Sequence, residues 1–70
     1  MHTMAEWPQE HGGIAAGTSI DVTLYYADGS TRKGYRDGWT GWMRWDERGL
    51  PQVCEDDETQ PIGWTELEAK

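Results

Sequence analysis

The sequence predicts a mostly β fold, namely a small twisted antiparallel sheet of four to five strands such as an SH3-like barrel. Three observations predict it. Residues 20–27 alternate apolar and polar side chains with the period of two typical of strands. Asp-Gly pairs at 28–29 and 37–38 mark tight turns, because glycine tolerates positive φ angles. The chain also lacks phenylalanine and instead carries β-favouring indoles at Trp7, Trp39, Trp42, Trp45 and Trp64.

The 70 residues are expected to form one domain with a small core. Residues 1–18 are predicted to be an irregular lead-in, since they contain several glycines and no apolar period, although Trp7 could dock on the core. Residues 19–70 are predicted to be a single β domain. So small a body cannot bury every indole, and an exposed tryptophan is therefore a candidate contact residue.

The clearest element is a hairpin across residues 19–36. A two-residue turn at 28–29 is the preferred register, and a three-residue loop at 27–29 is the alternative, which would turn the faces of the second strand over. The preferred register pairs Tyr26 with Thr31, Leu24 with Lys33, Val22 with Tyr35 and Asp21 with Arg36.

Further short strands are expected after the second turn. Residues 39–45 are predicted to be a third strand that places Trp39, Gly41, Met43 and Trp45 on one face and Thr40, Trp42 and Arg44 on the other. Residues 50–53 are predicted to be an edge strand, because Pro51 cannot donate to a central ladder. A last strand would place Ile62 and Trp64 on one face.

The formal charge is −7, from thirteen acidic and six basic residues. This balance argues against direct nucleic-acid binding, which depends on Lys and Arg at the phosphates. The acidic side chains could instead imitate a nucleic acid and occupy a basic cleft on another protein, or they could serve solubility alone. The candidate charged site is the acidic loop of Glu55, Asp56, Asp57 and Glu58.

The sequence contains no catalytic constellation, so we expect no enzyme. Cys54 is the only thiol, and His2 and His11 lie in the lead-in, where nothing is expected to fix their geometry. The acidic loop lacks the alternating spacing of a calcium loop, and one cysteine with two distant histidines cannot form a structural zinc site. The glycine-rich segment 12–18 lacks the lysine of a phosphate loop. We therefore expect no metal and no cofactor.

The single cysteine excludes an intramolecular disulfide, which fits a reducing compartment. No apolar run approaches about 18 residues, and the first residues lack the pattern of a signal peptide. The sequence therefore predicts a soluble, cytoplasmic protein without a membrane partner.

Aromatic side chains interleaved with arginines are the candidate apolar binding residues. The predicted strand faces place Tyr25 and Trp42 opposite their core-like neighbours and near Arg44. Such groups can anchor a protein partner or stack on a base. A sheet that closes on itself or dimerises would bury both faces instead.

Several features follow one another in a distinctive order: Trp7, then His11-Gly12-Gly13, then the hairpin from Asp21-Val22 to Asp28-Gly29, then three tryptophans, then Pro61-Ile62-Gly63-Trp64. This order resembles a class of small, mostly uncharacterised bacteriophage and prophage proteins, and the resemblance spans nearly the whole chain. Its motifs mark turns and core positions, so it brings no catalytic or binding residues. The acidic loop and the cluster of three tryptophans depart from the class. The resemblance implies a phage-type accessory protein that acts in the bacterial cytoplasm.

Three functional hypotheses follow. The first is a non-enzymatic protein-binding or inhibitory protein of phage type, which presents an acidic, nucleic-acid-mimicking face to a host defence or nucleic-acid-handling complex. The acidic loop would supply charge, and Trp42 and Tyr25 would supply an apolar anchor. The second is a small-ligand or nucleotide-binding module with a pocket of tryptophan and Arg32, Arg36 or Arg44. The third is a structural, homo-oligomeric, virion-associated protein.

Overall fold

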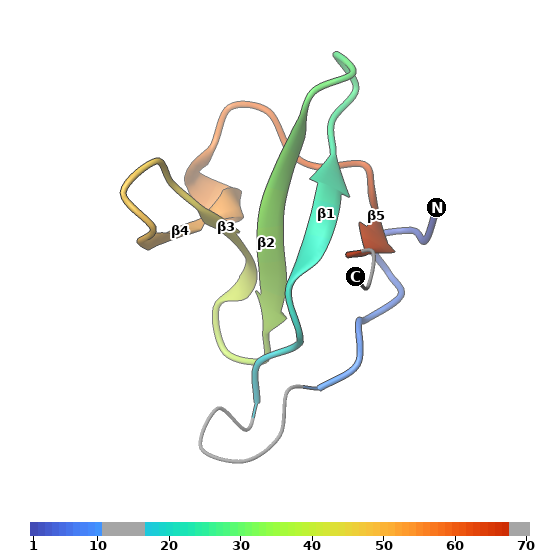
Figure 1. Cartoon of the computed structure of the whole chain (residues 1–70), viewed down its shortest axis with the longest axis vertical. Coiled ribbons are helices and arrows are strands. Elements are labelled where there is room, and N and C mark those ends of the chain that lie inside the picture. The colour runs from blue at the N-terminus through green and yellow to red at the C-terminus, as the bar shows by residue number, and fades with distance from the viewer. Residues whose placement is uncertain (11–16, 68–70) are drawn as a thin grey trace.

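The computed structural model of the chain describes residues 1–10 and 17–67. One antiparallel sheet runs in the order β4-β3-β2-β1-β5 (Figure 1). A short 3-10 helix, η2 (Cys54–Asp56), lies between the last two strands of the chain. The strands are β1 (Val22–Tyr25), β2 (Thr31–Asp37), β3 (Gly41–Trp45), β4 (Pro51–Val53) and β5 (Gly63–Glu66).

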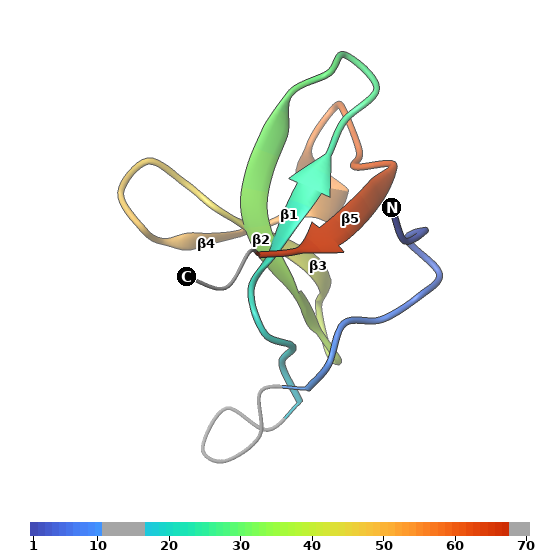
Figure 2. The ribbon, with the colours of Figure 1, turned by 45° about the vertical axis from the view of Figure 1, so that its right-hand side comes forward.

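The prediction of a mostly β, antiparallel fold is therefore confirmed. The sheet is strongly twisted (Figure 2). Its five strands form one open sheet across the described residues, with β4 and β5 at the two edges. Closure into an SH3-like barrel stays a prediction. The edge position of β4 agrees with Pro51, which has no amide hydrogen to donate.

The first hairpin adopts the three-residue loop. Val22 lies opposite Gly34, so the preferred pairing of Val22 with Tyr35 is wrong. The amide of Gly29 donates to the carbonyl of Tyr26 at 3.0 Å, and the φ of Gly29 is 89°. A two-residue type I′ turn would require a positive φ at the preceding aspartate as well. The loop that needs a left-handed conformation only at glycine is the one that forms.

This register turns the faces of β2 over, as the alternative predicted. Gly34 lies on the core side, and Tyr35 lies on the opposite side, where its ring centroid is 5.3 Å from that of Trp45. Asp21 does not pair with Arg36. It instead accepts a hydrogen bond from Trp45 Nε1 at 2.9 Å.

The second turn also contains three residues, because Asp37 pairs with Gly41. β3 therefore begins at Gly41, and Trp39 lies on the turn rather than in the strand. The prediction that Trp39 shares a strand face with Met43 and Trp45 is therefore wrong, because Trp39 lies outside the strand. At the end of the chain, Ile62 precedes β5 and is exposed, whereas Trp64 is buried, so these two side chains do not share an environment.

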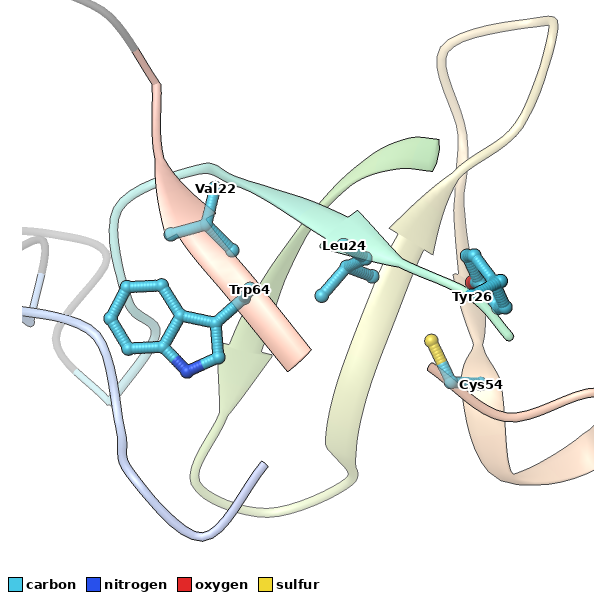
Figure 3. Packing of buried hydrophobic residues seen from close by; sticks show 5 residues of the cluster. All are labelled: Val22, Leu24, Tyr26, Cys54 and Trp64. Atoms are coloured by element: carbon cyan, nitrogen blue, oxygen red, sulfur yellow. The ribbon is translucent and has the colours of Figure 1, made fainter. Parts of the chain in front are cut away.

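The core occupies one face of the sheet (Figure 3). Its members are at most 6% exposed, and Met4 and Trp42 pack against them as partly buried neighbours. Figure 3 shows the indole of Trp64 beside Val22, and Cys54 beside Tyr26 at the other end of the cluster. The core consists of Val22, Leu24, Tyr26, Cys54 and Trp64.

Residues 1–7, here called the strap, lie against this face. The main chains of His2 and Trp64 exchange two hydrogen bonds, of 2.8 and 3.0 Å, along the outer edge of β5. The indole nitrogen of Trp64 donates to the carbonyls of Thr3 and Glu6 at 3.1 and 2.9 Å. The prediction that nothing fixes the geometry of His2 is therefore wrong. His11 and most of segment 12–18 lie outside the described residues.

Candidate interaction surface

Two indoles face solvent at one end of the sheet. Trp39 is 95% exposed on the β2–β3 turn, and Trp7 is 64% exposed. Arg36, near the end of β2, carries its guanidinium 4.5 Å from the ring centroid of Trp7. Trp7 therefore rests on Arg36 and not within the core. These three residues, Trp7, Arg36 and Trp39, are called the indole end below.

The turn that carries Trp39 is held by hydrogen bonds of its own. The carboxylate of Asp37 accepts from the amides of Trp39 and Thr40 at 2.7 and 3.3 Å. The amide of Gly38 donates to the carbonyl of Gly17 at 2.8 Å. Aspartate commonly caps turns in this way, which fixes the main chain beneath an exposed side chain. The indole of Trp39 is thus presented on an ordered turn.

Arg36 lies beside two indoles, because its guanidinium is also 5.8 Å from the ring centroid of Trp42. Its Nη1 donates to the carbonyl of Asp37 at 3.2 Å, and its buried Nε has no hydrogen-bond partner. Within the described residues, no ion pair includes Arg36. The two indoles therefore offer the guanidinium cation–π contacts in addition to this hydrogen bond.

The predicted acidic loop is divided by the structure. Glu55, Asp56 and Glu58 are exposed. Asp57 is partly buried and accepts two hydrogen bonds from Arg44, of 2.6 Å from Nε and 2.9 Å from Nη2. This contact lowers the pKa of Asp57 and raises that of Arg44. One of the four predicted charges is thus neutralised inside the molecule.

The two predicted apolar anchors lie on opposite faces of the sheet. Tyr25 points away from the core, and its hydroxyl is 3.1 Å from that of Thr65. Trp42 packs against the core, and its indole nitrogen donates to the carbonyl of Met4 at 3.3 Å. Trp42 and Arg44 share one face of β3, as predicted, but Arg44 is held by Asp57 of the acidic loop. The predicted site residues therefore do not converge on one surface.

The chain also has a hollow of about 260 Å³ beside the β1–β2 turn. No tryptophan lines it, and its two guanidinium groups face three carboxylates. Arg36, the arginine that does contact indoles, lies elsewhere. This hollow therefore does not combine tryptophan with arginine. The lining residues are Tyr26, Asp28, Ser30, Arg32, Arg44, Asp57, Glu58 and Thr59.

No protein-family model, curated protein or solved structure matches this chain. The surface is therefore interpreted from its own chemistry.

The surroundings of Cys54 do not activate its thiol. Cys54 is 1% exposed, and desolvation raises the pKa of its thiol to about 11, so it is protonated at neutral pH.

Among residues 1–10 and 17–67, no group of three or more His, Cys, Asp and Glu side chains could hold a metal ion. In the same part of the chain, no helix is long and apolar enough to cross a membrane.

Sequence reasoning left open which tryptophans are exposed and named Trp42, on the face away from the core, as the candidate contact. The structure instead packs Trp42 against the core and exposes Trp39 and Trp7. The local signal for Trp39 is its position after Asp37-Gly38 and before Gly41, since glycines on both sides place a residue on a turn. No local signal identifies Arg36, because its neighbour Trp7 comes from a distant part of the chain.

Proposed function

We propose that this chain is a non-enzymatic, protein-binding accessory protein that captures its partner through the indole end. The observation that carries the proposal is the 95% exposure of Trp39 on a turn that Asp37 holds in place. A fully solvated indole adds nothing to the core, whereas tryptophan is enriched among the residues that dominate binding energy. The ordered turn reduces the entropy lost on binding.

The acidic loop has a supporting role in this proposal. Glu55, Asp56 and Glu58 project into solvent and are available to attract a partner with a basic surface. For a phage-type protein, the partner would be a host or phage protein of the bacterial cytoplasm, such as a defence or nucleic-acid-handling complex. The indoles then supply the affinity, and the carboxylates supply the rate of encounter.

Substitution of Trp39 tests the proposal. The variant Trp39→Ala should keep the thermal stability of the parent, because the side chain is almost fully solvated. It should weaken capture of a partner from a bacterial lysate, identified by mass spectrometry, by about thirtyfold in dissociation constant. Calorimetry with the purified partner would measure that change.

Leu50→Ala is the matched control, since Leu50 is also exposed, at 52%, on the β3–β4 turn. It should bind like the parent chain. Equal binding by the parent and Trp39→Ala would contradict the proposal. Concentration-dependent self-association in sedimentation, lost in Trp39→Ala, would identify the partner as a second copy of the chain.

A further inference from the structure

His2 is held from three sides. Its Nδ1 lies 2.8 Å from Glu6 Oε2, within the strap, and its Nε2 lies 3.0 Å from Glu66 Oε1, on β5. Its ring stacks on the indole of Trp64, with centroids 4.2 Å apart and planes inclined by 28°. The side chain therefore joins the strap to the last strand.

Both ring nitrogens face a carboxylate, and this arrangement favours the protonated ring. A neutral imidazole carries one N–H, so its second nitrogen would present a lone pair to a carboxylate. The geometry at both nitrogens therefore favours the imidazolium. The hydrogen bond to Glu6 is the main cause that raises the pKa of His2, followed by desolvation, which opposes it, and then by Glu66.

The surrounding charged groups are consistent with a positive ring. The hydrogen bond to His2 is the main cause that lowers the pKa of Glu6, and the amide and hydroxyl of Thr3 also lie within 3.4 Å of this carboxylate. The pKa of Glu66 is lowered chiefly by a main-chain hydrogen bond, and in part by His2 and by the amino group of Met1.

We propose that His2 is a pH-sensitive latch that fastens the strap over the indoles of Trp42 and Trp64. When the ring loses its proton, one ring nitrogen presents a lone pair to its carboxylate, and that hydrogen bond is lost. Glu6 and Glu66 are 54% and 60% exposed, so either carboxylate is able to turn into water. The strap then retains only its main-chain and indole hydrogen bonds.

An open strap would change what the molecule presents to a partner. Closed, it occupies the outer edge of β5 and the indole N–H groups of Trp42 and Trp64. Opened, it leaves an unpaired strand edge, the kind of surface to which an extended segment adds by main-chain hydrogen bonds. Gly63 permits the closed state, since a Cβ there would lie 2.8 Å from the main-chain oxygen of His2.

The direction of the pH dependence follows from the linkage of proton binding to closure. A group whose pKa is raised in the closed state stabilises that state fully below its ordinary pKa, which is about 6.5 for histidine. That stabilisation is lost as the pH rises through the raised pKa of His2. The latch is therefore closed in mild acid, where Glu6 and Glu66 are still ionised, and is released on the alkaline side of about pH 6.5.

Nuclear magnetic resonance of the full chain tests the latch. The substitution His11→Gln leaves His2 as the only imidazole, so the ring signal belongs to it. We expect this signal to titrate with a midpoint above about 6.5. The protection factor of the Trp64 Nε1–H should fall across the same range, by about tenfold for each unit by which the midpoint exceeds that value.

Two variants separate the latch from a general effect of pH. His2→Gln should remove the pH dependence of Trp64 protection, whereas Glu10→Gln, in the same stretch of chain but without contact to His2, should preserve it. A His2 midpoint at or below about 6.5 would overturn the proposal. Unchanged Trp64 protection across the His2 titration of the otherwise unaltered chain would also overturn it, whatever the stability of the variants. These readouts do not depend on Trp39, so failure here leaves the proposed function standing.

Discussion

At Gly34, strands β1 and β3 approach β2 so closely that a side chain has no space. A Cβ would lie 2.6 Å from Leu24 Cδ1 and would meet the carbonyl oxygen of Met43. Both neighbours are buried, and the oxygen belongs to the main chain of an adjacent strand. The absence of a side chain at this position therefore permits the close packing of the core.

We predict that Gly34→Ala lowers the free energy of unfolding by about 1–3 kcal/mol, the range typical of overpacked cores. Gly29→Asn is the control from the same hairpin. Open space surrounds Gly29, and asparagine tolerates the left-handed conformation that its φ of 89° requires. Urea unfolding would measure both variants. A Gly34→Ala chain as stable as the parent would contradict the close approach.

The tryptophans illustrate how differently one residue type is used. Trp64 is 3% exposed and binds two strap carbonyls, whereas Trp39 is 95% exposed. Both directly follow a glycine, and locally they differ in that Trp39 is also followed by Gly41, which favours a turn. The role of each indole depends on whether another segment covers it.

At the scale of elements, the contact of Arg44 with Asp57 joins β3 to the residue that follows η2. It is a two-bond guanidinium–carboxylate contact, with side chains 20% and 23% exposed. Such bonds are stronger than those of neutral pairs because both partners are charged. The pair thus holds the acidic loop against the sheet.

We predict that Asp57→Asn destabilises the fold by about 1 kcal/mol, whereas Asp56→Asn, at an exposed position, has little effect. Arg44 is the main cause that lowers the pKa of Asp57. The stability due to Asp57 is therefore present above about pH 3.9, the ordinary value, and is lost as the pH falls through the lowered pKa. Thermal unfolding between about pH 2 and pH 7 should show a smaller acid-side loss in Asp57→Asn than in the parent. Identical pH profiles would contradict this account.

Across the whole molecule, Trp39 and the acidic segment that follows η2 lie apart. The β1–β2 turn and the segment after η2 lie at one end of the sheet, and the β2–β3 turn with Trp39 lies at the other (Figure 1). Attraction by charge and contact by indoles are therefore assigned to different parts of the surface. They are expected to affect different rate constants of the proposed complex.

We predict that neutralising Glu55, Asp56 and Glu58 together slows association with the partner by about tenfold at low salt and changes dissociation little. Glu47→Gln, at an exposed acid on the β3–β4 turn, is the control for loss of charge elsewhere. Asp57 is left intact because its loss would also release Arg44. Surface plasmon resonance at several salt concentrations would measure both rates. An unchanged association rate would leave the acidic loop without a role in recognition.

The sequence by itself determined that short strands alternate with tight turns near the two Asp-Gly pairs and that Pro51 lies at an edge, since alternation, Asp-Gly pairs and a missing amide hydrogen act within a few residues. The hairpin pattern left two registers open, because one residue of slip conserves the pattern while it reverses every face. The tertiary structure shows the register whose loop needs a left-handed conformation only at glycine. It also decided which predicted site residues meet. Asp57 accepts hydrogen bonds from Arg44, and the indole nitrogen of Trp42 donates to the carbonyl of Met4 in the strap. Contacts between segments distant in the chain leave no periodic signal, and for that reason the latch at His2 and the indole end emerge only from the fold.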